Sequence, residues 1–335
     1  MIDFLKCPIS QRVYGGAAGR KLGIIYNNEY YMLKFPGNLK EQNLKNIELS
    51  YSNAPISEYI GSQIISSIGL PVHETLLGQY GNKIVVACKD FVKAGCRLQE
   101  FEKYKITFNP KFLDSNGNET NGTGTDLQEI LLTIKEHTLF QDKNMVEARF
   151  WDMFVVDTLI GNTDRNNGNW GFIIDANEKM HLAPIYDNGN CLNNKWDDKK
   201  MNSLLQSPEE MRVEAYTGRR CVFLLNNKRI NPYKILQDKQ YEGANSAIIR
   251  IVPHIDMDKI KDIIYNISDE IVSPTRKEFY TEIMNIRYKE VLLPLYQELT
   301  KEKELSFEEK LDRLYEETYN GFSSYSEVIH ISERT

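Results

Sequence analysis

The sequence predicts an α+β protein of two lobes, a small β-rich N-terminal lobe and a larger, mainly helical C-terminal lobe. Two observations lead to this prediction. Short apolar runs separated by turn signals fill about the first hundred residues, whereas long segments with helical spacing fill the chain beyond about residue 125. With 335 residues, the chain is long enough for two units that each bury an apolar core.

Two strands are expected at the start of the small lobe. Residues 21–26 alternate loosely between apolar and polar side chains, and Asn27-Asn28 is a turn signal. Residues 30–35 form a second run, rich in aromatic and apolar residues, which Pro36-Gly37 closes.

A helix and two further strands complete this lobe. Isoleucine recurs every fourth residue over 56–68, which is helical spacing, and Gly69 and Pro71 end that helix. Strands are then expected over 74–80 and 83–91, on either side of a turn at Gly81-Asn82.

The C-terminal lobe is expected to be built from helices around one buried helix. Helices are predicted over 126–137 and 144–160, and the second is apolar on most faces, so it should lie in the core. A short strand over 171–174 and a strand leading to Tyr186 follow. The remaining expected helices cover 255–267 and 274–299, with a charged surface helix over 302–317.

The predicted domain boundaries follow from these elements. Residues 1–104 form the N-lobe, and residues 105–125, rich in Asp, Asn and Gly, form a loop at the seam between the lobes. The helical C-lobe spans 126–325, and 326–335 is a tail.

Composition excludes several classes of protein. Lys plus Arg number 41 and Asp plus Glu 47, a net charge of −6 that argues against a dedicated nucleic-acid binder. No apolar run approaches the roughly 18 residues of a membrane span. No Sec-type signal is visible, and the five cysteines show no CxxC spacing, so a reducing cytoplasm is the expected compartment.

A run of small residues precedes the first long strand. Small side chains let backbone N–H groups approach phosphate oxygens, and such a nest binds anions. A flexible turn is the alternative interpretation of the same run. The residues concerned are Gly16, Ala17, Ala18 and Gly19, followed by Lys21.

Lys34 ends the second strand, and Glu58 lies on the helix that follows. A strand lysine flanked by apolar residues can point into a cleft and neutralise phosphates, and a helix glutamate can hold its ammonium. An edge lysine and a surface glutamate are the alternative for each residue taken alone.

A polar stretch over 161–170 follows the buried helix. Within it, Asp164 and Asn169 have the D-x-x-x-x-N spacing of a kinase catalytic loop. An aspartate there can accept the proton of an attacking hydroxyl, and an asparagine amide oxygen can ligate Mg²⁺. Asp, Asn and Gly also gather in turns, but ten polar or small residues are more than a turn needs.

Asp187 is expected at the end of a strand, in Asp187-Asn188-Gly189. A second Mg²⁺ carboxylate would sit there, with Gly189 in the place of the glycine of D-F-G. A hairpin turn is the alternative. The order of all these features, more than any one of them, favours nucleotide-dependent phosphoryl transfer.

The sequence resembles the HipA-like serine/threonine kinases, and more closely their short, CtkA-like members. The resemblance covers about the first two hundred residues. It is carried by the stretches 15–21, 31–36, 57–59, 68–72, 83–91, 150–172 and 183–192.

The resemblance implies a kinase-like fold of two lobes, ATP and Mg²⁺ as cofactors, and a role for each motif. Asp164 matches the catalytic aspartate, Asn169 and Asp187 match the Mg²⁺ ligands, and Lys34 matches the phosphate-contacting lysine, with residues 16–21 as the phosphate loop. A hinge whose backbone meets the adenine is matched by Ala87, Cys88 and Lys89.

The resemblance also implies partners. Family members phosphorylate Ser or Thr hydroxyls of proteins. Some are toxins restrained by a small DNA-binding antitoxin, and CtkA-like members are suspected effectors that leave the cell. HipA toxins carry an extra N-terminal subdomain, which is expected to be absent here or supplied by another chain.

Two departures from the family limit what is carried over. The segment just before the loop glycine has no serine nearer than Ser10, so self-inactivation by autophosphorylation there is not expected. Asn166 stands where a histidine is often found. A nucleotide-binding pseudokinase and a small-molecule or lipid kinase remain alternative functions.

Overall fold

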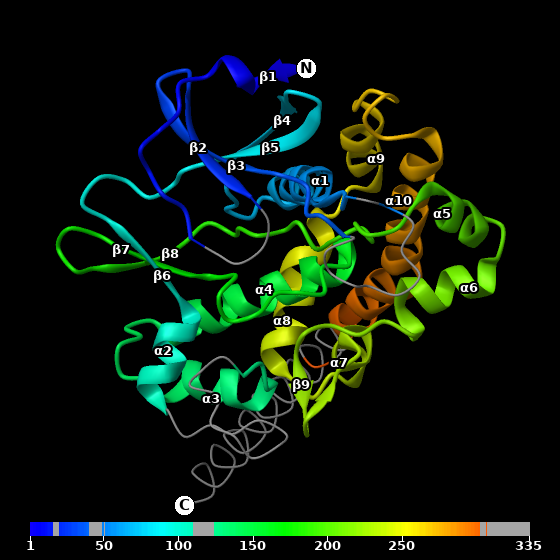
Figure 1. Cartoon of the computed structure of the whole chain (residues 1–335). Helices are drawn as coiled ribbons and strands as arrows, with labels where there is room; N and C mark the ends of the chain where they lie inside the picture. The colour runs from blue at the N-terminus through cyan, green and yellow to red at the C-terminus, as the bar shows by residue number, and fades with distance from the viewer. Residues whose placement is uncertain (16–19, 40–48, 50, 110–123, 302–305, 307–335) are drawn as a thin grey trace, which may run out of the picture.

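Two lobes make up the chain, a small one built on a β-sheet and a larger one built mainly of helices, as the sequence predicts (Figure 1). The computed structural model describes residues 1–15, 20–39, 49, 51–109, 124–301 and 306. Within these ranges, no helix is long and apolar enough to cross a membrane.

A five-stranded sheet forms the small lobe. Its order is β1-β4-β5-β3-β2, with β1 parallel to β4 and the other neighbours antiparallel. Asn27 and Asn28 both have positive φ, of 49° and 63°, which is the backbone that a two-residue hairpin turn requires. The strands are β1 (Ile2–Asp3), β2 (Lys21–Tyr26), β3 (Glu29–Lys34), β4 (Thr75–Tyr80) and β5 (Lys83–Lys89).

Helix α1 (Ala54–Ser67) packs against β4 and β5 of this sheet and against α9 (Met257–Tyr265) of the large lobe. Pro55 stands in its first turn, where the missing N–H is not needed. Ile60 and Ile64 are fully buried, which confirms the helical spacing of isoleucine in the sequence. Because α1 touches both lobes, it can carry a side chain into the space between them.

The pairing of the strand that follows β5 bears on where the small lobe joins the large one. Strand β6 (Arg97–Glu100) pairs with β7 (Gly171–Ile174), which in turn pairs with β8 (Met180–Leu182), and α2 (Phe101–Phe108) follows β6 directly. Residues 97–108 therefore lie with the large lobe. We propose residues 90–96 as the link between lobes, in place of the predicted seam at 105–125, much of which lies outside the described residues.

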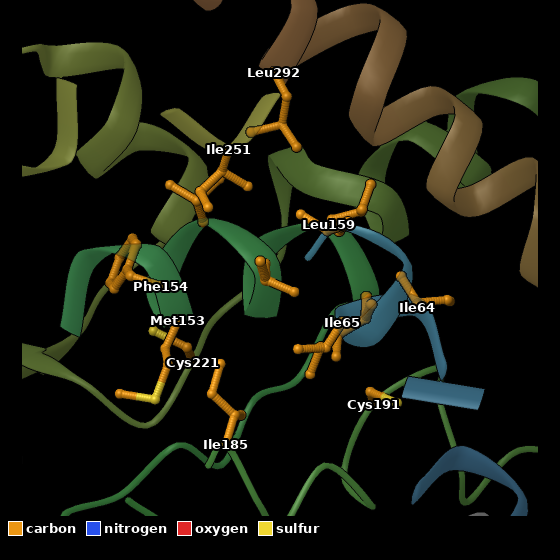
Figure 2. Packing of buried hydrophobic residues seen from close by; sticks show 14 of the residues in the cluster. Ile64, Ile65, Met153, Phe154, Leu159, Ile185, Cys191, Cys221, Ile251 and Leu292 are labelled. Carbon is orange, nitrogen blue, oxygen red and sulfur yellow. The ribbon is translucent and has the colours of Figure 1, made fainter. Parts of the chain in front are cut away.

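Helix α4 (Lys143–Ile160) is the centre of the large lobe. Every residue from 150 to 160 is buried, as its apolar sequence predicts (Figure 2). The Asp142 carboxylate caps its first turn by accepting from the backbone N–H of Met145. The helix ends at Gly161, which has a φ of +69°, and a Cβ there would lie 2.6 Å from Arg287.

The other elements surround α4. Helices α3 and α8 pack along it (Figure 1). Helix α10 continues through a π-helical segment, Tyr288–Leu292, into helical residues 293–301. This continuous run confirms the helix expected over 274–299. The expected charged helix over 302–317 lies almost wholly outside the described residues. The remaining bounds are α3 (Leu127–Glu136), α5 (Asp198–Leu205), α6 (Pro208–Arg212), β9 (Leu224–Leu225), β10 (Lys228–Arg229), α7 (Pro232–Asp238), α8 (Glu242–Ile251), α9 (Met257–Tyr265) and α10 (Pro274–Arg287), with short turns at Phe4–Lys6, Val213–Thr217 and Val252–His254.

The strand expected to lead to Tyr186 is shorter than predicted. Strand β8 ends at Leu182, and beyond it only Ile185 forms an isolated bridge, to Val72. Asp187 therefore does not end a strand. It has a φ of +62°, in the left-handed region that non-glycine residues seldom adopt.

Candidate active site

A cleft of about 620 Å³ opens between the lobes, and the predicted site residues meet there. It is lined by Lys21, Lys34 and Glu58 from the small lobe and by Asp164, Asn169 and Asp187 from the large lobe. Gly16, Ala17, Ala18 and Gly19, the predicted phosphate loop, lie outside the described residues. Segments that are far apart in the sequence thus contribute to one site.

Lys34 lies at the end of β3 and bridges two carboxylates. Its Nζ donates to Oε2 of Glu58 over 2.8 Å and to Oδ1 of Asp187 over 2.5 Å. Burial lowers the pKa of Lys34, but the two carboxylates outweigh burial and raise that pKa well above its ordinary value. The ammonium is therefore charged and fixed at the centre of the cleft.

Glu58 is 1% exposed and holds this lysine from α1. Its Oε1 lies 2.9 Å from Nε2 of His73 and accepts the backbone N–H of Asn188, also over 2.9 Å. Burial raises the pKa of Glu58, but Lys34 and His73 outweigh burial and lower it. The carboxylate is thus ionised, so Nε2 of His73 must carry a proton and donate it.

Asp164 lies in the loop that follows α4, and its carboxylate is held by amides. Nδ2 of Asn190 donates to Oδ2 over 2.9 Å, and Nδ2 of Asn166 lies 3.3 Å from Oδ1. Burial raises the pKa of Asp164, while the amide of Asn166 and the positive charge of Lys195 act in the opposite direction. A carboxylate oriented in this way can accept a proton from a hydroxyl in the cleft.

Asn169 and Asp187 offer oxygen atoms to the cleft. Nδ2 of Asn169 donates to the backbone carbonyl of Asp164 over 2.7 Å, so the amide nitrogen is engaged and its oxygen can act as a ligand. The side chain of Asp187 is 42% exposed, although it pairs with Lys34. An amide oxygen and a carboxylate in one polar cleft are a donor set that fits Mg²⁺.

Arg165 holds together the loops that carry the predicted catalytic aspartate and the predicted metal ligands. Its guanidinium is 2% exposed and donates to both carboxylate oxygens of Asp157, over 2.8 and 2.9 Å. It also donates to the backbone carbonyls of Asn169 and Tyr186 and to the side chain of Asn188. One buried arginine therefore fixes the loops that carry both predicted metal ligands.

Arg165, His73 and Asn190 contact the predicted site residues or the loops that carry them, and the sequence did not single them out. Asp157 was a usable signal for Arg165, because a carboxylate inside an apolar helix needs a buried cation nearby. His73 and Asn190 carry no such signal, since only the fold brings them to Glu58 and Asp164.

The expected hinge residues lie within the sheet. Ala87 and Cys88 are buried in β5, which pairs with β3 on one side and β4 on the other, and the side chain of Lys89 pairs with Glu29 and Glu74. None of the three lines the described cleft. Their contact with adenine stays a prediction.

The chain leaves the sheet at Asp90. Its carboxylate accepts from Arg12 and from the hydroxyl of Tyr14, over 2.5 and 2.9 Å, and from the backbone N–H of Val92. The segment just before the predicted phosphate loop is thereby anchored beside the link between the lobes.

Glu58, His73 and Cys88 form a compact group, with ligand atoms within 4.8 Å of one another. This group does not fit a metal ion. Lys34 already neutralises Glu58, and burial raises the pKa of Cys88 well above its ordinary value, so its sulfur is a neutral thiol. Of the three, Glu58 lines the cleft, whereas His73 and Cys88 do not.

Comparison with known proteins places this geometry in a family. The family model described as "HipA-like C-terminal domain" matches residues 14–231. The serine/threonine-protein kinase CtkA of Helicobacter pylori strain J99 is 40% identical over 294 residues, which cover 87% of this chain and 86% of that protein.

Two solved structures share the fold. The crystal structure of the proinflammatory kinase CtkA of Helicobacter pylori is 37% identical, covers 90% of this chain and 98% of its own, and superposes with a TM-score of 0.80. HipA of Shewanella oneidensis MR-1, solved with HipB and operator DNA, is 13% identical to this chain. The match covers 85% of this chain and 67% of HipA, with a TM-score of 0.52. At this identity, the match shows the fold alone. The chain therefore belongs to the HipA-like serine/threonine kinase family.

Proposed function

We propose that this kinase transfers the γ-phosphoryl group of ATP, with Mg²⁺, to Ser or Thr hydroxyls of a protein. The observation that carries the proposal is the double ion pair of Lys34 with Glu58 and Asp187, in the cleft that Asp164 also lines. A cation held by a helix glutamate next to a metal carboxylate is the arrangement that phosphoryl transfer uses.

Each side chain then has a defined task. Lys34 binds triphosphate oxygens, with Glu58 keeping its ammonium in place. Asn169 and Asp187 hold Mg²⁺, which supplies charge neutralisation at the phosphates. Asp164 orients the acceptor hydroxyl and takes its proton, while positioning and charge supply most of the rate.

Nucleotide binding also involves parts of the small lobe. Lys21 lines the cleft, and its Nζ donates to the carbonyl of Gly15, so the chain on either side of residues 16–19 borders the site. We include residues 16–19 in the proposed function as the phosphate loop. The backbone just beyond β5, near Val92, is the proposed neighbour of the adenine, together with the predicted residues 87–89.

A pseudokinase that binds nucleotide without turnover is the alternative of another class. It is disfavoured because Asp164 and Asp187, the two carboxylates that turnover needs, both line the cleft. A small-molecule or lipid kinase would use the same groups, and the acceptor decides between these possibilities.

We include in this proposal that the kinase acts as a toxin or as a translocated effector, with or without autophosphorylation. The Shewanella oneidensis relative is a toxin solved with HipB. By analogy, a small antitoxin is a candidate partner, and so is a separate protein that supplies an N-terminal subdomain.

The proposal is tested with γ-labelled ATP and a generic protein acceptor. Label should enter the acceptor with Mg²⁺ and not with EDTA, and mass spectrometry should place it on Ser or Thr of the acceptor or of the chain itself. ATP binding without any transfer would support the pseudokinase, and transfer only to small molecules or lipids would support the third alternative.

A further inference from the structure

Four cations line the cleft, and among the described residues only one of them, Lys34, is paired with carboxylates. Lys34 is paired with Glu58 and Asp187, and Lys21 donates to a backbone carbonyl of the small lobe. Lys195 and Arg229 line the same cleft from the large lobe. Among the residues that the structure describes, neither has an acidic side chain within ion-pair distance.

Lys195 lies on the Asp164 side of the cleft. It follows Asn194, whose Nδ2 lies 3.3 Å from Oδ1 of Asn190, and Asn190 in turn donates to Asp164. Lys195 is half-buried and lines the same cleft as Asp164. Lys34, in contrast, is paired with Glu58 and Asp187.

Arg229 is held in place by the hairpin of β9 and β10. The backbone of this hairpin bonds to the rest of the large lobe through Leu224, whose N–H donates to the Thr125 carbonyl over 3.0 Å. Arg229 is exposed and Lys195 is half-buried, and both line the cleft. From this difference in exposure we place Arg229 towards the mouth of the cleft and Lys195 further in. The two cations thus mark a path from solvent towards Asp164.

The direction of phosphoryl transfer indicates that this path is the one by which the acceptor reaches Asp164. The attacking and leaving oxygens are roughly in line, so the acceptor enters on the side of the γ-phosphate opposite the rest of the nucleotide. Lys34 and Asp187 occupy the nucleotide side, and Asp164 faces the acceptor. An acceptor chain that places its hydroxyl at Asp164 therefore passes Lys195 and Arg229.

We propose that Lys195 and Arg229 form an acceptor subsite that selects a Ser or Thr flanked by an Asp or Glu residue. This inference rests on the proposed function and specifies its substrate. A flanking carboxylate would be repelled by Asp164 and Asp187 unless cations received it. The chain carries a net charge of −6, so two cations that lack an acidic partner among the described residues do not reflect a generally basic surface.

The subsite is tested with two sets of Ser peptides. In one set Glu replaces each flanking residue in turn, in the other set Gln does, and the peptides are otherwise identical. The readout is the ratio of kcat/KM for a Glu peptide to that for its Gln counterpart. The wild-type chain should favour Glu at one or two positions by about 10-fold, and Lys195→Gln and Arg229→Gln should each reduce this ratio about 3- to 10-fold.

Lys228→Gln is the matched control, because Lys228 is the exposed neighbour of Arg229 on β10 and does not line the cleft. It should leave the ratio unchanged. In Arg229→Glu the preference should move from Glu towards Lys at the same position. The KM for ATP should stay within about twofold of wild type throughout, because the subsite meets the acceptor and not the nucleotide.

Equal wild-type rates for the Glu and Gln peptides would overturn the inference while leaving the proposed function in place. A raised KM for ATP with an unchanged Glu preference would also overturn it, because the two cations would then serve the triphosphate. Transfer to no peptide at all by the wild-type chain would contradict the proposed function and the inference together.

Discussion

The backbone N–H of Asn188 donates a hydrogen bond of 2.9 Å to Oε1 of Glu58, although 130 residues separate them in the chain. This bond joins α1 of the small lobe to the loop that carries Asp187. The other oxygen of Glu58 holds Lys34. Because one buried carboxylate serves both contacts, the lysine proposed to bind phosphate and the loop proposed to bind the metal are positioned together.

Glu58→Gln should destabilise the chain by about 2–4 kcal/mol at pH 7, since a buried charge partner of Lys34 is lost. The folded-state pKa of Glu58 lies below its unfolded value, so the ionised group stabilises the fold above the unfolded pKa, near 4.3. That contribution is lost as the pH falls from about 5 towards the folded pKa. The free energies of unfolding of the two proteins should therefore converge in acid.

Urea denaturation between pH 7 and pH 3 measures this convergence. Glu282→Gln is the control, because Glu282 is exposed on α10 and should show no such difference at any pH. A gap between Glu58→Gln and wild type that stays constant with pH would show that the charge of Glu58 is not what stabilises the fold.

Asp187→Asn should abolish the thermal stabilisation that Mg²⁺ adds to ATP. The carboxylate is the anionic ligand offered beside Asn169, and a neutral amide binds the cation more weakly. Turnover should fall at least ~10²-fold. Melting curves with ATP, with and without Mg²⁺, provide the measurement.

Asp258→Asn is the control for that substitution, since Asp258 is an exposed residue of α9 remote from the cleft lining. It should respond to Mg²⁺ and ATP as wild type does. A full magnesium response in Asp187→Asn would assign the metal to other ligands.

Arg165→Met should destabilise the chain by about 3–5 kcal/mol, because it leaves the Asp157 carboxylate buried without its cation. Arg97→Met removes an ion pair in which both side chains are exposed, so its effect on the free energy of unfolding should be small. Chemical denaturation of both variants compares them. Equal losses in the free energy of unfolding of the two variants would mean that the buried Arg165 does not hold the loops together.

Asn190→Ala should lower kcat about 10-fold and leave the KM for ATP almost unchanged, since the Asn190 amide donates to the Asp164 carboxylate, which is proposed to act on the acceptor. Steady-state kinetics give both constants. Asn177→Ala, in the exposed turn between β7 and β8, should change neither. A rise in the KM for ATP at constant kcat would place Asn190 in nucleotide binding instead.

Local patterns were sufficient to predict the elements that carry the site. The isoleucine spacing placed α1, and the apolar run before Gly161 placed α4, because both patterns depend only on neighbouring residues. The same patterns placed Lys34 at the end of a strand and Asp164 just after a buried helix. Their approach to one cleft was predicted from the order of the motifs together with the family resemblance.

Non-local bonds explain what the sequence did not reveal. The strand expected to reach Tyr186 stops at Leu182 because the Tyr186 carbonyl and the Asn188 N–H bond to Arg165 and Glu58 instead of to another strand. Strand β6 pairs with β7 across some seventy residues of chain, which no local pattern records. His73 and Asn190 belong to the site through such contacts alone.

The rate of γ-phosphoryl transfer by Asp164→Asn tests the central claim, that these segments converge on one cleft for phosphoryl transfer. Asparagine keeps the shape of the side chain but cannot take the acceptor proton. The predicted result is a loss of at least ~10²-fold in turnover, with an unchanged circular dichroism spectrum and an affinity for Mg²⁺ and ATP within about threefold of wild type. Transfer near the wild-type rate would contradict the claim.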